Sequence, residues 1–106
     1  MVRYKIDILK ALKDTGWSQT KLTKNQVLSS MTIQNMRDRT KLQNLSPEEI
    51  AEDPRLSKMK TDDIMLPNLE SLNNICIILG VQLSDIIEIV DTDEEVLKFH
   101  RLKNKR

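Results

Sequence analysis

The stretch WSQTKLTKNQVLSSMTIQNMR, residues 17–37, carries the strongest structural signal in the sequence. Ser18 is a natural N-cap, because its hydroxyl can accept a hydrogen bond from a free amide in the first turn of a helix. Residues 25–27 have turn character, and Ser29 is placed to cap a second helix over about 30–38. The stretch predicts two short helices joined by a tight turn, an arrangement that can place the second helix in the DNA major groove.

The apolar side chains of this stretch fall on inward positions. Trp17 and Leu22 occupy the two positions of a hydrophobic staple around the cap, which favours Trp17 as a core anchor over a stacking role. Ile33 and Met36 lie three residues apart and are expected to face the core. The outer face of the second helix then carries Ser30, Met31, Gln34 and Asn35.

Helices are also predicted on both sides of this pair. Residues 4–15 have one apolar stripe and end at Gly16, a residue that favours helix termination. Asn68 is expected to cap a helix that ends at Gly80, and Ser84 a last helix over residues 85–90. The predicted buried stripe of the helix after Asn68 is Leu69, Leu72, Ile75, Cys76 and Leu79.

Residues 39–67 differ from the rest in composition, with several acids and no aromatic residue. Ser46, Pro47 and Glu49 form a capping-box helix start, and Pro54 limits that helix. We interpret the segment as an inserted short helix flanked by loops, with a narrow apolar edge. The segment has three alternative roles: it adds DNA contacts, it binds a protein partner, or it partly covers the DNA-binding site. The residues of the apolar edge are Ile50, Leu56 and Met59.

Composition indicates a small cytoplasmic protein without a membrane span. The chain has 106 residues, 39% of them hydrophobic and 3% aromatic, so an aliphatic core is expected. The single Cys76 fits a reducing compartment and cannot form an intramolecular disulfide. One His and one Cys do not suffice for a typical structural zinc site, and no phosphate-binding glycine loop is present, so no cofactor and no metal are predicted. A nucleic-acid enzyme would need an acidic metal site, for which Asp62 and Asp63 are the candidates.

The net charge of +1 hides three segments of different sign. Residues 1–41 hold nine Lys/Arg against three acids, and residues 42–95 hold three against thirteen. Residues 96–106 hold five Lys/Arg and no acid. Basic segments can bind phosphates by releasing counterions, whereas the acidic middle either contacts a partner or is a solvated face.

The outer side chains of the second helix suit base edges. Asn can pair bidentately with adenine, Ser can donate or accept, and Met can pack on a thymine methyl group. Gln19 is placed to bind a phosphate at the start of the first helix of the pair. The basic residues expected around this face are Lys21, Lys24, Arg37, Arg39 and Lys41.

Three segments resemble the phage-repressor and Cro-type helix-turn-helix family: RYKIDILKALKDTGWSQTKLTK, VLSSMTIQNMR and LPNLESLNNICIILGVQLSDIIEIV. The resemblance covers residues 3–37 and 66–90. It implies an operator-binding domain of five helices that commonly dimerises, and it assigns the DNA-contact positions to Gln19, Ser30, Met31, Gln34 and Asn35. The family often has Gly where Val27 stands, so the turn is expected to differ, since a β-branched residue adopts positive φ poorly. About 29 residues also separate helices that the family joins by a few.

Together these observations predict an all-α, five-helix phage-repressor-like domain over residues 1–90, with an insert at about 39–67 and an acidic-then-basic tail over 91–106. The predicted function is sequence-specific binding of double-stranded DNA by a transcriptional regulator, with repression favoured by the resemblance. Homodimer candidates are Ile77, Ile78 and Ile89. The alternative is a protein-interaction module, such as an antitoxin or antirepressor-type partner, that uses the acidic insert and the basic tail.

Overall fold

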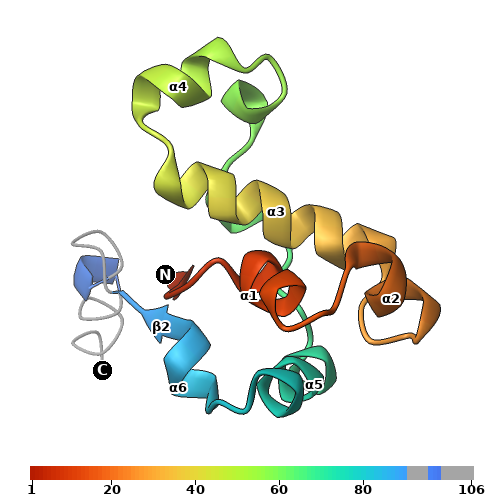
Figure 1. The fold of residues 1–106 in the computed structure, drawn as a ribbon. Coiled ribbons are helices and arrows are strands. Elements are labelled where there is room, and N and C mark those ends of the chain that lie inside the picture. Colours follow the sequence, from red (N-terminus) through yellow and green to blue (C-terminus); the bar gives the residue numbers. More distant parts are fainter. Residues whose placement is uncertain (91–95, 99–106) are drawn as a thin grey trace.

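Helix α3, Ser30–Asn44, is the longest helix in the described part of the chain, and the other elements are arranged along it (Figure 1). The computed structural model describes residues 1–90 and 96–98. The strands are β1 (Val2–Tyr4) and β2 (Ile87–Ile89). The other helices are α1 (Ile8–Asp14), α2 (Gln19–Lys24), α4 (Pro47–Glu52), η1 (Leu56–Lys58), η2 (Thr61–Asp63), α5 (Leu69–Leu79) and α6 (Leu83–Ile86).

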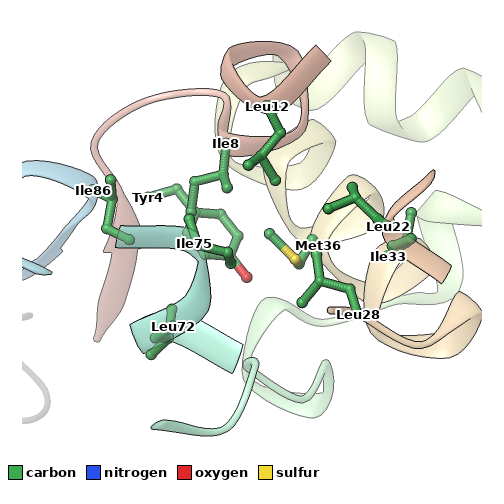
Figure 2. Packing of buried hydrophobic residues seen from close by; sticks show 10 residues of the cluster. All are labelled: Tyr4, Ile8, Leu12, Leu22, Leu28, Ile33, Met36, Leu72, Ile75 and Ile86. Carbon is green, nitrogen blue, oxygen red and sulfur yellow. The ribbon is translucent and has the colours of Figure 1, made fainter. Parts of the chain in front are cut away.

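The core lies where α1, α2, α3 and α5 meet, and it is mainly aliphatic (Figure 2). Ile33, Leu12 and Ile75 are 0% exposed, and each comes from a different helix. Trp17 is partly buried against this cluster, so its prediction as a core anchor is confirmed. The buried cluster consists of Tyr4, Ile8, Leu12, Leu22, Leu28, Ile33, Met36, Leu72, Ile75 and Ile86.

Most predicted helix starts are confirmed by side-chain caps. The oxygens of Ser18, Ser29, Ser46 and Asn68 each accept a hydrogen bond from the backbone amide three residues on. Gly80 follows α5 with φ +67°, a left-handed conformation that strains any residue with a Cβ. Local capping chemistry therefore sets these boundaries.

Other predicted boundaries were wrong. α1 begins at Ile8 behind an Asp7 cap rather than at residue 4, and α3 continues to Asn44 rather than ending near residue 38. Ser84 does not cap the last helix, because α6 starts at Leu83 behind Gln82 and gives way to a strand at Ile87. Pairing of Val2–Tyr4 with Ile87–Ile89 accounts for the later start of α1 and for the strand that follows α6.

A two-stranded antiparallel sheet, which the sequence analysis did not predict, adds to the helical fold. β1 pairs with β2 in the register Val2–Ile89, Arg3–Glu88 and Tyr4–Ile87. On Tyr4, the backbone N–H donates to Gln43 Oε1 at 2.9 Å, and the carbonyl accepts from Gln43 Nε2. The side-chain amide of α3 thus continues the ladder on the other edge of β1. The start of the chain is fixed to the long helix in this way.

Two predictions about apolar residues have mixed outcomes. Leu72 and Ile75 are buried as expected, but Leu69, the first residue of α5, is 77% exposed. In the segment before α5, Leu56 is 1% exposed and Ile64 is 8% exposed. The segment therefore buries side chains of its own instead of extending freely from α3.

Within residues 1–90 and 96–98, no helix has the length and hydropathy that a membrane crossing needs. The sequence-based predictions for residues 91–95 and 99–106, which include most of the acidic-then-basic tail, concern residues outside the described part.

Tyr4 provides a pH prediction for the fold. Burial raises the pKa of its phenol to about 12, although the nearby Arg39 cation lowers it slightly. Because the folded pKa exceeds the unfolded value of about 10, the phenol contributes stability below pH 10 that is lost as the pH rises towards 12. Absorbance of the only tyrosine at 295 nm should therefore titrate near pH 12 in the folded protein and near pH 10 in concentrated urea. A native midpoint at pH 10 would contradict the burial of Tyr4.

Candidate nucleic-acid interface

The helix pair α2–α3 forms a helix-turn-helix, and its turn avoids a positive φ at Val27, as the β-branch of that residue led us to expect. Gln26 adopts φ +57°, and Val27 is not among the residues with positive φ. The backbone amides of Val27 and Leu28 both reach the carbonyl of Leu22, at 2.9 and 3.4 Å. The left-handed conformation therefore lies at the residue before Val27, where a side chain without a β-branch tolerates it better. Leu28 is 3% exposed and anchors the turn in the core.

The first turns of α3 divide into a buried face and an outer face. Ile33 and Met36 are 0% and 1% exposed, as predicted, and Met31 is 73% exposed. Ser30 is also exposed, whereas Gln34 and Asn35 are half-buried. All four predicted base-reading side chains thus belong to the surface that the core leaves free.

Arg37 joins the outer face of α3 to the start of α2. Its Nη2 donates to Gln19 Oε1 at 2.7 Å, and its Nη1 donates to Gln34 Oε1 at 3.4 Å. One guanidinium therefore holds two of the predicted contact residues, which come from different helices. Both acceptors are neutral amides, so the positive charge of Arg37 is not cancelled by them.

The remaining cations lie around this pair. Lys21, Lys24 and Lys41 are exposed, and Lys21 Nζ lies 4.3 Å from the centre of the Trp17 ring, a cation–π distance. A groove of about 510 Å³ between α1, α2 and α3 has a mainly apolar lining with one acid, Asp7. Four cations line the same groove: Lys10, Lys13, Arg37 and Lys41.

Lys10 and Lys13 therefore belong to this basic surface, although the sequence analysis did not predict them as DNA contacts. The general signal for them was present, since residues 1–41 have a large excess of Lys and Arg. Their position beside Gln19 and Arg37 depends on how α1 packs against α2 and α3, which no local pattern shows.

Arg39 is a correction, because it is not part of the basic surface. It is only 4% exposed, and its guanidinium points into the protein. Nη1 donates to the carbonyls of Thr61 and Ile64 at 2.6 and 2.9 Å, and Nη2 donates to the carbonyl of Val2 at 2.9 Å. A side chain held in this way has no freedom to reach a phosphate. Its role is to join β1, α3 and η2.

Asp38, the next buried polar residue, is paired with a residue that sequence reasoning missed. Arg55 forms a bidentate ion pair with both of its carboxylate oxygens. Burial by itself would raise the pKa of Asp38, but hydrogen bonds from Arg55 and Gln34 outweigh it and hold the pKa below its ordinary value. Asp38 is therefore ionised at neutral pH and neutralised from within the fold. The partners are 17 residues apart, and no spacing rule links them.

Within the described ranges, no three His, Cys, Asp or Glu side chains gather into a group that could hold a metal ion. The arrangement that the structure does show is an exposed polar and apolar helix face bordered by cations. Such a face can donate to, accept from and pack against base edges while its borders bind phosphates.

Comparisons with known proteins agree with this geometry. No curated protein and no solved structure matches the chain. A family model described as a Cro/C1-type HTH DNA-binding domain matches residues 30–92, more than half of the chain, from the first residue of α3 onwards. The match confirms the resemblance drawn from the sequence, although α1 and α2 lie before it. The chain belongs to the Cro/C1-type HTH DNA-binding domain family.

Proposed function

We propose that the protein is a cytoplasmic, sequence-specific DNA-binding transcriptional regulator, of the repressor type, that acts without a cofactor and without catalysis. The amino-terminal half of α3 reads base edges in the major groove. The observation that carries this proposal is the outer face of α3, where Met31 is 73% exposed while Ile33, two residues on, is fully buried. Membership of a DNA-binding family supports the same function.

In this mechanism each group of side chains has a separate task. Asn35 suits a bidentate contact with adenine, Met31 the methyl group of thymine, and Ser30 a mixed donor and acceptor. The flanking groups bind phosphates and set the orientation of α3 without reading sequence. These are Gln19, Lys21, Lys24, Arg37 and Lys41, and Gln34 lies between the two groups.

The segment between α3 and α5 is an insertion relative to the short connection typical of the family, in a domain that otherwise has five helices. Its acids keep it away from phosphates, so we place it outside the DNA contact. A homodimer completes the proposal, because a two-fold repeat of α3 matches two half-sites. Ile77 and Ile89, at 71% and 77% exposed, are its contact candidates, whereas Ile78, the third candidate from the sequence, is partly buried against the core.

Selection of bound duplexes from a random DNA library, together with the mass of the protein in solution, tests this function. An enriched motif with two-fold symmetry and the mass of a dimer are the expected results. Enrichment of no motif would contradict sequence-specific binding, and a monomeric mass with and without DNA would contradict the dimer.

Truncating the reading side chains is expected to weaken binding without unfolding the protein. Met31→Ala and Asn35→Ala should each cost about 1–3 kcal/mol on the selected operator and relax the preference at one base pair. Fluorescence anisotropy titrations and a repeated selection measure both effects. Lys24→Gln is the matched control. Loss of a phosphate contact should lower the affinity for all DNA sequences alike, and it should reduce the slope of log affinity against log salt concentration by about one unit. Unchanged affinity and preference in folded Met31→Ala and Asn35→Ala variants would refute this assignment of the face.

A further inference from the structure

A continuous chain of hydrogen bonds runs from the segment after α4 to the start of α2. Arg55 Nη1 donates to Asp38 Oδ1 at 2.8 Å, and Gln34 Nε2 donates to the same oxygen at 3.0 Å. Arg37 then donates to Gln34 Oε1 and to Gln19 Oε1. The chain therefore connects Arg55 with three residues of the proposed DNA interface, although Arg55 lies outside α2 and α3.

The direction of each bond follows from Asp38. Its carboxylate only accepts, so the Gln34 amide must turn its Nε2 towards Asp38 and its Oε1 away. The Oε1 then faces Arg37, whose guanidinium has a second nitrogen left for Gln19. One ionised carboxylate thus determines how two neutral amides and one cation are oriented.

Arg55 keeps this carboxylate in place. Its planar guanidinium donates two parallel hydrogen bonds, one to each carboxylate oxygen of Asp38. A single ammonium group cannot form this parallel pair. Without it, a buried anion would lie on the helix proposed to read DNA, close to Arg37 and Lys41. That anion would attract these cations and repel phosphates.

We propose that Arg55 is a positioning residue for DNA recognition, which acts through Asp38 to orient Gln34 and Arg37. This inference rests on the proposed function and gives the segment between α3 and α5 a role in it without direct DNA contact. Arg55 itself is 51% exposed, so a direct contact between Arg55 and a phosphate is the competing arrangement.

A double-mutant cycle on the operator selected from the random library separates the two arrangements. Arg55→Gln is expected to lower operator affinity about 10-fold, in the range of measured couplings between residues of one network. In the Asp38→Asn background the same change should have no further effect. The slope of affinity against salt concentration should stay unchanged, because no phosphate contact is lost.

Lys58→Gln provides the matched control, since it removes the same charge from the same segment at an exposed residue. It is expected to leave operator affinity unchanged. Equal losses for Lys58→Gln and Arg55→Gln would reduce the effect to general electrostatics and overturn the proposal. An Arg55→Gln effect that adds fully to Asp38→Asn and lowers the salt slope by about one unit would overturn it in favour of a phosphate contact.

The free protein gives a readout that does not depend on DNA. In NMR spectra of the free protein, the side-chain amide resonances of Gln34 should shift in Arg55→Gln and stay in place in Lys58→Gln. Unmoved Gln34 resonances in Arg55→Gln would overturn the inference whatever the DNA data show. Shifted resonances in a protein that selects no DNA sequence would instead refute the proposed function, and the recognition role with it. If Arg55→Gln does not melt cooperatively, Arg55→Lys serves the same comparison, because it keeps the charge and loses the two-pronged contact.

Discussion

Replacing Ile33 with alanine is expected to lower the free energy of unfolding by about 2–5 kcal/mol, the usual cost of truncating a fully buried aliphatic side chain. Ile33 is 0% exposed, and its side chain belongs to the buried cluster of the core (Figure 2). The cost has two parts, namely the lost transfer of the removed methyl groups from water and the cavity that incomplete relaxation leaves. Since a small domain has only about 5–15 kcal/mol of stability in total, the melting temperature should fall by many degrees.

Met31→Ala is the matched control for this prediction. It truncates an exposed side chain of the same helix, two residues earlier, and should change stability by less than about 0.5 kcal/mol. The two variants are thus expected to show opposite behaviour, with Ile33→Ala losing stability and Met31→Ala losing DNA affinity. Urea denaturation followed by circular dichroism measures the first effect. If the midpoints of the two variants were equal, the division of α3 into two faces would be incorrect.

Replacing Arg39 with methionine is expected to destabilise the fold by roughly 2–4 kcal/mol. The guanidinium supplies donors to the carbonyls of Val2, Thr61 and Ile64, and methionine keeps the apolar stem but donates nothing. Each hydrogen bond to a charged group contributes about 1.5–3 kcal/mol, and release of the buried cation offsets part of the sum. The loss should appear first in β1, because the bond to Val2 joins that strand to α3.

Lys41→Met is the control, since Lys41 is an exposed cation two residues further along the same helix. Its effect on stability should stay within about 0.5 kcal/mol. Amide hydrogen exchange of Val2–Tyr4 measures the local opening of β1 in both variants. A fully stable Arg39→Met protein with lower DNA affinity and a smaller dependence of that affinity on salt would instead place Arg39 in the basic surface as a phosphate contact.

Local chemistry explains which elements could be predicted from the sequence. The caps Ser18, Ser29 and Asn68 act through hydrogen bonds that span three residues, so a short window of sequence contains both the donor and the acceptor. The inward positions of Ile33 and Met36 follow from helical periodicity in the same way. The outer face of α3, which carries the proposed base contacts, could therefore be predicted from the sequence.

Long-range contacts explain what the sequence alone did not show. β1 forms because Val2–Tyr4 finds a partner strand more than eighty residues away, and α3 extends past residue 38 because its second half supplies Arg39 and Gln43 to that strand. By composition, Arg39 resembled the other cations of the basic region. Only the carbonyls that surround it distinguish a buried connector from a phosphate ligand.

Four features could be predicted from the amino-acid pattern: the helix-turn-helix pair, its capped helix starts, the face of α3 turned away from the core, and the family to which the chain belongs. The caps and faces depend on residues within about one or two helical turns of one another, where spacing and side-chain chemistry suffice, and the family resemblance combines several such stretches. The sheet between β1 and β2, the burial of Arg39 and the pairing of Asp38 with Arg55 became visible only in the tertiary structure. These depend on contacts between segments far apart in the sequence, because a buried charge can be placed only when its distant partners are brought around it.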